Sequence, residues 1–181
     1  MNNPKENKLR LTQDLLLGGK VTLWQSFDGY RAGIDAVLLA TSTKPKANQR
    51  ILDLGCGAGA VSLCVLANYP DVFVTGLEIM EETVDVAKLN AEENNFKLNF
   101  CPILGSITDM PSTIKKKSFD LVLSNPPFAA SGTSNFSSNI RKKIAHVETG
   151  THIEMWIKVA AAALKHKGII SLIHRADRLD H

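Results

Sequence analysis

The chain has 181 residues, of which 44% are hydrophobic and 22% charged, and its formal net charge is +3. These values are typical of one soluble globular domain, and no apolar run is long enough to cross a membrane. Three cysteines without CxxC spacing and a polar N-terminal segment predict a reduced, cytoplasmic protein without a structural zinc site. The weakly basic charge is compatible with a nucleic-acid partner but does not identify one.

The first residues predict a polar tail and a small hairpin. Residues 1–14 are mostly polar and are expected to form a solvated tail, so that the domain begins at residue 15. Apolar segments over residues 15–17 and 20–25 flank Gly18-Gly19, a pair that tolerates positive φ. They predict two short strands joined by a tight turn.

A loop over residues 27–35 follows the hairpin. It combines glycines with Tyr30, Arg31 and Asp35, a mixture that suits a ligand-lining loop as well as a plain connection. Asp35 is expected to cap a helix over residues 36–41, because its side chain can accept hydrogen bonds from the free N–H groups of the first turn.

A strand, a glycine turn and a helix form the centre of the sequence. Residues 50–54 predict a buried strand that runs into Gly55-Cys56-Gly57-Ala58-Gly59 and then into a helix over residues 60–67. The glycines let the backbone approach a ligand, and the helix N-terminus offers free N–H groups. A second strand over residues 72–77 ends at Glu78, where a carboxylate can accept two hydrogen bonds from a ribose diol.

Two further elements follow at helical and extended spacing. Residues 80–94 predict a helix whose inner side is marked by Val84, Ala87, Leu89 and Ala91. Residues 98–104 predict a third strand at a sheet edge, because Pro102 cannot donate a hydrogen bond to a neighbour.

The fourth strand, residues 119–123, is stopped by Ser124-Asn125-Pro126-Pro127-Phe128. Two prolines fix φ and hold the backbone extended, so the side-chain oxygen of Asn125 and the carbonyl of Pro126 can act as fixed acceptors. Phe128 can stack on a planar ring. The segment suits a planar group that carries an NH2, although taken alone it fits a plain strand-to-turn junction equally well.

The last part of the chain predicts a loop, a helix and a strand. Residues 129–150 form a long loop rich in Ser, Asn and Gly, which favours a mobile substrate-binding flap. Residues 151–167 predict a helix with Lys165, His166 and Lys167 in its last turn and Gly168 closing it. Residues 169–173 predict a fifth strand. The alternation of strands and helices predicts an α/β fold with a Rossmann-like, doubly wound parallel sheet.

Asp53-x-Gly55-x-Gly57-x-Gly59, followed by Glu78 at the next strand end, resembles the class I S-adenosylmethionine-dependent methyltransferases. In that family the glycine turn packs against the amino-acid part of the cofactor, and the acidic residue holds the ribose hydroxyls. The spacing fits poorly to the Gly-x-Gly-x-x-Gly of hydride-transfer folds. Together with Asn125-Pro126-Pro127-Phe128, it is similar to methyltransferases that act on the NH2 groups of planar substrates.

The chain resembles one group within this class, the bacterial valine-tRNA adenine-N6 methyltransferase family. The more specific resemblance is carried by residues 17–21 and 29–40, and it extends over residues 15–175. The resemblance implies S-adenosylmethionine as cofactor, tRNA as partner and the Asn125–Phe128 segment as the catalytic one, with no metal. It implies cofactor contacts from Tyr30, Arg31, Gly33, Asp35, Asp53, Gly55, Gly57, Gly59, Glu78, Ile79, Ser106, Ile107 and Asn125. Arg141, Lys142 and Lys143 are candidates for RNA phosphate contacts.

The chemistry of such a substrate predicts a mechanism. An exocyclic amine on a heteroaromatic ring is a poor nucleophile because its lone pair is delocalised. If Asn125 and Pro126 accept its hydrogens, the nitrogen can pyramidalise and direct its lone pair at the methyl group. The sulfonium already activates that methyl, so orientation and electrostatic complementarity can supply most of the catalytic effect.

Two features depart from the family pattern. Gly105-Ser106 stands where many class I enzymes carry an acidic residue for the adenine amine, and Asp109 is close but out of register. Class I sheets have seven strands, whereas this sequence supplies five. The domain over residues 15–181 is therefore expected to be truncated and to lack the C-terminal strands.

Other functions fit part of the pattern. The rRNA guanine-N2 and release-factor glutamine methyltransferases also use Asn-Pro-Pro-aromatic, and a DNA adenine methyltransferase would need a target-recognition domain that is not visible. From a different class, a non-catalytic S-adenosylmethionine- or RNA-binding protein remains an alternative. An NAD-dependent oxidoreductase leaves the Asn-Pro-Pro-Phe segment unexplained.

Overall fold

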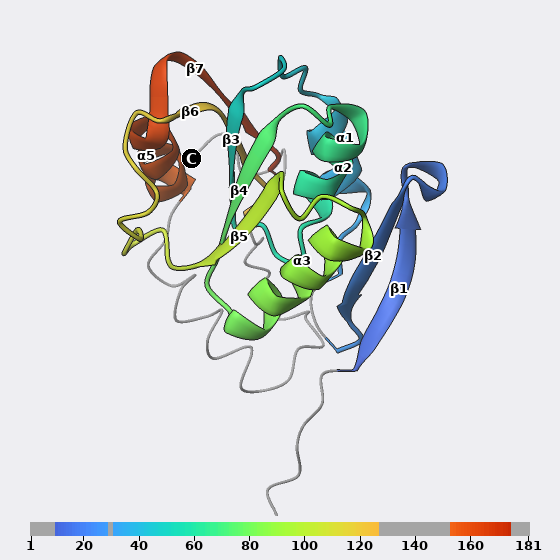
Figure 1. The fold of residues 1–181 in the computed structure, drawn as a ribbon. Helices are drawn as coiled ribbons and strands as arrows, with labels where there is room; N and C mark the ends of the chain where they lie inside the picture. The colour runs from blue at the N-terminus through green and yellow to red at the C-terminus, as the bar shows by residue number, and fades with distance from the viewer. Residues whose placement is uncertain (1–9, 29–30, 127–152, 175–181) are drawn as a thin grey trace, which may run out of the picture.

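The computed structural model describes residues 10–28, 31–126 and 153–174 and contains a five-stranded parallel sheet with the order β5-β4-β3-β6-β7 (Figure 1). The strands are β3 (Arg50–Leu54), β4 (Phe73–Glu78), β5 (Phe100–Leu104), β6 (Phe119–Ser124) and β7 (Leu164–Leu172). From β3 the chain moves outward to β4 and β5, then returns to the other side of β3 for β6 and β7. This order confirms the predicted doubly wound sheet, with β5 at an edge.

Helices cover both faces of the sheet (Figure 1). One face carries α1 (Ile34–Thr41), α2 (Ala60–Asn68) and α3 (Glu81–Glu93), and the other carries α5 (Ile153–Ala163). Neighbouring residues of β3 point to opposite faces, so Ile51 joins the core under the first three helices and Leu52 joins the core under α5. None of the helices in the described part of the chain is long and apolar enough to span a bilayer.

A separate hairpin precedes the sheet. β1 (Leu11–Leu16) pairs antiparallel with β2 (Val21–Ser26) around a tight turn in which Gly18 and Gly19 both have positive φ. The hairpin and its glycine turn were predicted, but the prediction of a polar tail over residues 1–14 extends too far. Residues 11–14 belong to β1, because pairing with β2 satisfies their backbone groups despite their polar side chains.

The first helix and the connection after β5 also differ from the predictions. α1 begins at Ile34 with Gly33 as its N-cap, so Asp35 lies inside the first turn and makes no capping hydrogen bond. Its charge still faces the positive end of the helix dipole. Between β5 and β6 the chain forms turns and one isolated bridge, Ser106 to Asp109, so the strand–helix alternation is interrupted there.

The prediction for the end of the last helix is wrong. α5 ends at Ala163, and Lys165, His166 and Lys167 lie in β7 rather than in a final helical turn. Leu164 already pairs with Phe119 of β6, and Lys165 Nζ lies 2.9 Å from both carboxylate oxygens of Asp120. Pairing with β6 therefore ends the helix before Gly168 is reached.

Candidate functional site

The carboxyl ends of β3, β4 and β6 meet at the point where the strand order reverses. Leu54 pairs with Leu77 on one side and with Ser124 on the other, so Gly55, Glu78 and Asn125 continue from neighbouring positions. The Ser124 hydroxyl donates to the carbonyl of Leu54 at 3.0 Å, which fixes the junction between β3 and β6. In doubly wound sheets, the crevice outside such strand ends is where ligands bind.

The glycine turn after β3 owes its residues to both conformation and packing. Gly55, Gly57 and Gly59 have φ of +70, +55 and +91, in the region that disfavours other residues. A Cβ at Gly55 would lie 3.0 Å from the Trp156 ring, and one at Gly59 would lie 2.6 Å from the Phe100 ring. A Cβ at Gly57 would meet no atom of the described residues within 4 Å, so among them this side of the turn is open to close approach by a ligand.

The carboxylate of Glu78 ties the end of β4 to the glycine turn. Its Oε2 accepts a hydrogen bond from Gly57 N–H at 3.0 Å, and its Oε1 accepts one from Met80 N–H at 2.9 Å. Burial raises the pKa of Glu78, while these backbone donors oppose the shift. A carboxylate oxygen can accept more than one hydrogen bond, so Glu78 can still bind hydroxyl groups of a ligand.

Asp53 lies beneath the same turn and is 1% exposed. Its Oδ2 accepts a hydrogen bond from the Ser62 hydroxyl of α2 at 2.7 Å. Burial raises the pKa of Asp53 to about 6, although the Ser62 hydrogen bond partly opposes the shift. Sequence reasoning missed Ser62; the available signal was a serine within the otherwise apolar start of α2.

Asn125 presents an oxygen without a partner. Its Oδ1 is buried and accepts no hydrogen bond from the described residues, and Pro126 beside it is also buried. Leaving a buried acceptor unsatisfied costs about 1–3 kcal/mol, and such groups are rare in native proteins. A substrate N–H is the kind of donor that would satisfy it. Pro127 and Phe128 lie outside the described residues.

The loop before α1 is fastened to the hairpin. Arg31 Nη1 donates to the Thr12 hydroxyl at 2.6 Å, and Nη2 forms an ion pair with Asp14. The side chain of Gln25 donates to the same carboxylate at 2.7 Å and accepts from Ala32 N–H at 2.9 Å. The Arg31 guanidinium therefore binds β1, while Gly33 and Asp35 lie at the start of α1.

The remaining residues predicted to contact the cofactor or RNA either make contacts within the protein, are exposed, or fall outside the described residues. Ile107 is 7% exposed and packs in the core beneath α5, and the Ser106 hydroxyl lies 2.8 Å from that of Thr108. Ile79 follows Glu78 and is 44% exposed. Tyr30, the flap over residues 129–150 and the basic residues Arg141, Lys142 and Lys143 lie outside the described residues. Within the described ranges, no group of three or more His, Cys, Asp or Glu could hold a metal ion.

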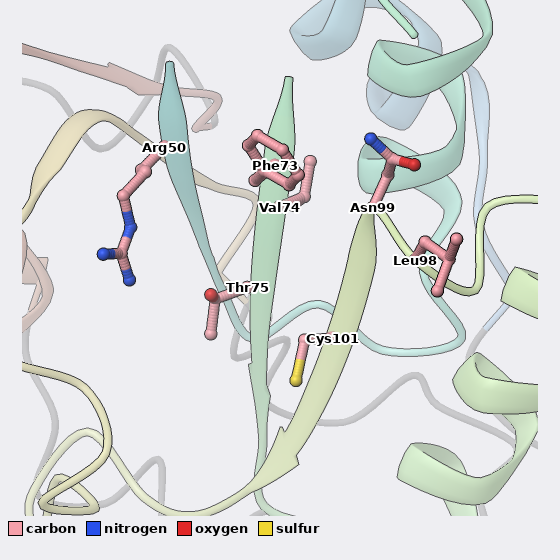
Figure 2. A pocket seen from close by; sticks show the side chains of 7 residues that line it. All are labelled: Arg50, Phe73, Val74, Thr75, Leu98, Asn99 and Cys101. Carbon is pink, nitrogen blue, oxygen red and sulfur yellow. The ribbon is translucent and has the colours of Figure 1, made fainter. Parts of the chain in front are cut away.

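A pocket of about 330 Å³ lies at the opposite, amino end of the strands (Figure 2). It is lined by Arg50, Phe73, Val74, Thr75, Leu98, Asn99 and Cys101. These residues come from β3, β4, β5 and the loop before β5, and they include neither Glu78 nor Asn125. The pocket is therefore separate from the strand ends that carry the candidate site.

Comparison with known proteins gives consistent results. The family profile described as "Methyltransferase small domain" matches residues 31–178. A tRNA1(Val) (adenine(37)-N6)-methyltransferase from Porphyromonas gingivalis is 32% identical over 155 residues, covering 82% of this chain and 60% of the relative. A release factor glutamine methyltransferase from Neisseria gonorrhoeae is 34% identical over 90 residues, covering 50% of this chain and 32% of the relative.

The chain thus spans about 60% of the length of the tRNA-modifying relatives. Among solved structures, a predicted O-methyltransferase, Atu636 from Agrobacterium tumefaciens, is similar with a TM-score of 0.63 at 26% identity, over 81% of this chain and 64% of that one. A methyltransferase from Thiobacillus denitrificans bound to S-adenosyl-L-homocysteine shares the fold with a TM-score of 0.55 at 20% identity, over 81% and 50% of the two chains. The profile match, the sequence relatives and the sheet order agree, and the chain belongs to the methyltransferase small domain family.

Proposed function

We propose that this chain is an S-adenosylmethionine-dependent N-methyltransferase that modifies the exocyclic amine of a nucleobase, adenine N6 at position 37 of valine tRNA. The observation that carries the proposal is the buried, unpartnered Oδ1 of Asn125 at the end of β6, next to the glycine turn. An acceptor that the described protein leaves unsatisfied matches a substrate that brings an N–H donor.

The glycine turn and Glu78 would hold the cofactor. The open side of Gly57 allows the backbone to approach the amino-acid part of S-adenosylmethionine. Glu78, already oriented by Gly57 and Met80, would accept hydrogen bonds from the ribose hydroxyls. The positive charges of the cofactor would favour the carboxylate form of Asp53 and so offset the burial that raises its pKa.

Asn125 and Pro126 would orient the amine that receives the methyl group. When both oxygens accept its hydrogens, the nitrogen lone pair turns out of the ring plane and toward the electrophilic methyl. S-adenosylmethionine held by the glycine turn and Glu78 would supply an activated methyl group. The amine nitrogen would gain that methyl and lose one proton to solvent, and the sulfur would leave as a neutral thioether. Because the sulfonium is already reactive, orientation accounts for most of the effect, and no strong base is required.

The choice of adenine in tRNA rests on family likeness. The relative from Porphyromonas gingivalis matches 82% of this chain, whereas the glutamine methyltransferase from Neisseria gonorrhoeae matches 50%. A glutamine side chain also presents an NH2 group and would fit the same acceptors, so release factor is the competing substrate. A tRNA substrate would place the activity in the cytoplasm.

The test is incubation with labelled S-adenosylmethionine and unmodified bulk tRNA, followed by nucleoside analysis. The proposal expects label in N6-methyladenosine. Parallel reactions with unmodified rRNA and with release factor separate the alternatives. Label confined to N2-methylguanosine or to protein would contradict the proposed substrate, and an absence of transfer to all of them would favour a binding protein.

A further inference from the structure

Asn90 of α3 lies between the hairpin and the glycine turn. It is 0% exposed, and all of its side-chain hydrogen-bonding groups are used. Its Oδ1 accepts from Trp24 N–H at 2.7 Å, while its Nδ2 donates to the carbonyls of Trp24 and Ala58, each at 2.8 Å. Since Trp24 belongs to β2 and Ala58 to the glycine turn, one amide group connects two segments that are far apart in the sequence.

Asn94 repeats the contact to the hairpin one helical turn later. Its Oδ1 accepts from Thr22 N–H at 2.8 Å, and its Nδ2 donates to the carbonyls of Thr22 at 2.7 Å and Asn90 at 2.8 Å. Four residues of helix rise about 6 Å, and two residues of strand rise about 7 Å. This match lets two asparagine amides pair with the free edge of β2, in the way that another strand would.

The two asparagines bind different partners beyond β2. Both fasten β2 to α3, but only Asn90 also binds the glycine turn among the described contacts. The hairpin in turn holds the loop before α1, through the contacts of Asp14 with Arg31 and of Gln25 with Ala32. Asn90 is therefore the junction between the glycine turn and the hairpin that carries the Arg31 loop.

We propose that Asn90 is a positioning residue that sets the glycine turn and the hairpin in the relative geometry needed to bind the cofactor. This inference rests on the cofactor site proposed above at the glycine turn. The Ala58 carbonyl belongs to the Ala58–Gly59 peptide, one residue after Gly57, so its hydrogen bond to Asn90 holds the turn next to its open part. Asn94 serves as a docking residue for the hairpin alone.

The test compares Asn90→Ala with Asn94→Ala as a matched pair, using calorimetric binding of S-adenosylhomocysteine and urea unfolding of the whole chain. Each change removes the contacts of one asparagine to β2. We expect both to lower the unfolding midpoint, and Asn90→Ala to weaken S-adenosylhomocysteine binding about tenfold more than Asn94→Ala. Equal losses of affinity, or a larger loss for Asn94→Ala, would overturn the assignment.

Two further variants keep the result interpretable. If Asn90→Ala does not fold, the pair Asn90→Ser and Asn94→Ser retains one donor at each position and is expected to give the same ranking. Gly57→Val tests the location of the cofactor site itself, because a side chain there would project into the open side of the turn. If Gly57→Val binds S-adenosylhomocysteine as the wild type does, the proposed cofactor site is rejected. If Gly57→Val loses binding but the Asn90 and Asn94 variants have equal affinities, only the role of Asn90 is rejected.

Discussion

Buried and partly buried carboxyl groups have opposite pKa shifts at the two ends of the parallel sheet. At the amino end, Asp120 of β6 accepts hydrogen bonds from Arg50 N–H and from Lys165 Nζ, each at 2.9 Å. Burial raises the pKa of Asp120, but these partners outweigh that effect, and its pKa lies below the usual value. The charge at this end is matched within the protein and therefore favours the folded state.

At the carboxyl end, the effect of burial outweighs that of the hydrogen-bond partners. Burial raises the pKa of Asp53 and of Glu78, and Asn125 Oδ1 accepts nothing from the described residues. These buried groups destabilise the folded state, and a bound ligand that contacts them would offset part of that destabilisation. The difference indicates that the carboxyl end is maintained for binding rather than for stability.

The largest effect is expected at Asn125. Asn125→Ala removes one of the two acceptors proposed for the amine, and we expect methyl transfer to fall by roughly 100-fold or more. S-adenosylhomocysteine affinity should stay near the wild-type value, because Asn125 is assigned to the substrate. The free energy of unfolding should not fall, since the change removes an unsatisfied oxygen. A parallel loss of cofactor affinity would contradict this assignment.

Asp53 should make stability depend on pH. Its folded pKa is about 6 against an ordinary value of 3.8, so the folded state holds the proton more tightly than the unfolded state. Stability therefore falls as pH rises through this interval, by on the order of 3 kcal/mol in total. Chemical unfolding of wild type and Asp53→Asn between pH 4 and 8 measures the effect. As pH rises, the free energy of unfolding of Asp53→Asn should increase relative to that of the wild type. A difference that stays constant with pH would show that the pKa of Asp53 is not raised.

Several features of the fold could be predicted because they follow from local chemistry. Gly18 and Gly19 have the positive φ expected for the hairpin turn, and Pro102 lies in an edge strand. The errors arose where tertiary contacts override local preference. Lys165 was placed in a helix by its position after an apolar face, whereas pairing with β6 and the contact with Asp120 place it in a strand.

The neighbouring positions of Asn125 and Glu78 could be predicted, because the carboxyl ends of parallel strands meet at one edge. Their roles at the site stay predictions, and the contacts that support them were not foreseen. Asn90 was overlooked because Leu89 was assigned to the inner side of α3, although Leu89 is 39% exposed and Asn90 fully buried. A sequence shows that a polar residue lies on an apolar face, but not which distant carbonyls it reaches.

Two glycines of the turn after β3 are expected to tolerate a side chain differently, because Gly59 packs against Phe100 and Gly57 lies on the open side. Gly59→Ala would bring a Cβ to within 2.6 Å of Phe100, and we expect a loss of about 1–3 kcal/mol in unfolding free energy. In Gly57→Ala the new Cβ meets no atom of the described residues, and the change should cost about 1 kcal/mol through the positive φ alone. Combining Gly59→Ala with Phe100→Leu should recover part of the loss. Equal costs for the two single variants would show that the Phe100 contact does not constrain the turn.

The smallest effect is expected at the amino end. Lys165→Ala removes an ion pair whose side chains are 44% and 22% exposed, and solvent screening limits its contribution to below about 1 kcal/mol. S-adenosylhomocysteine affinity should not change, because the pair lies at the other end of the strands. Thermal unfolding with and without S-adenosylhomocysteine measures both quantities. A weaker ligand-induced shift in the variant would break the proposed separation of the two ends.

The most direct test of that separation is a set of backbone amide NMR spectra recorded during titration with S-adenosylhomocysteine. We expect the largest shifts at Gly57 and Met80, whose N–H groups both bind Glu78. Amides of Thr75 and Cys101, which line the pocket of about 330 Å³ at the amino end, should remain unchanged. Shifts centred on Thr75 and Cys101, with Gly57 and Met80 unaffected, would contradict the account.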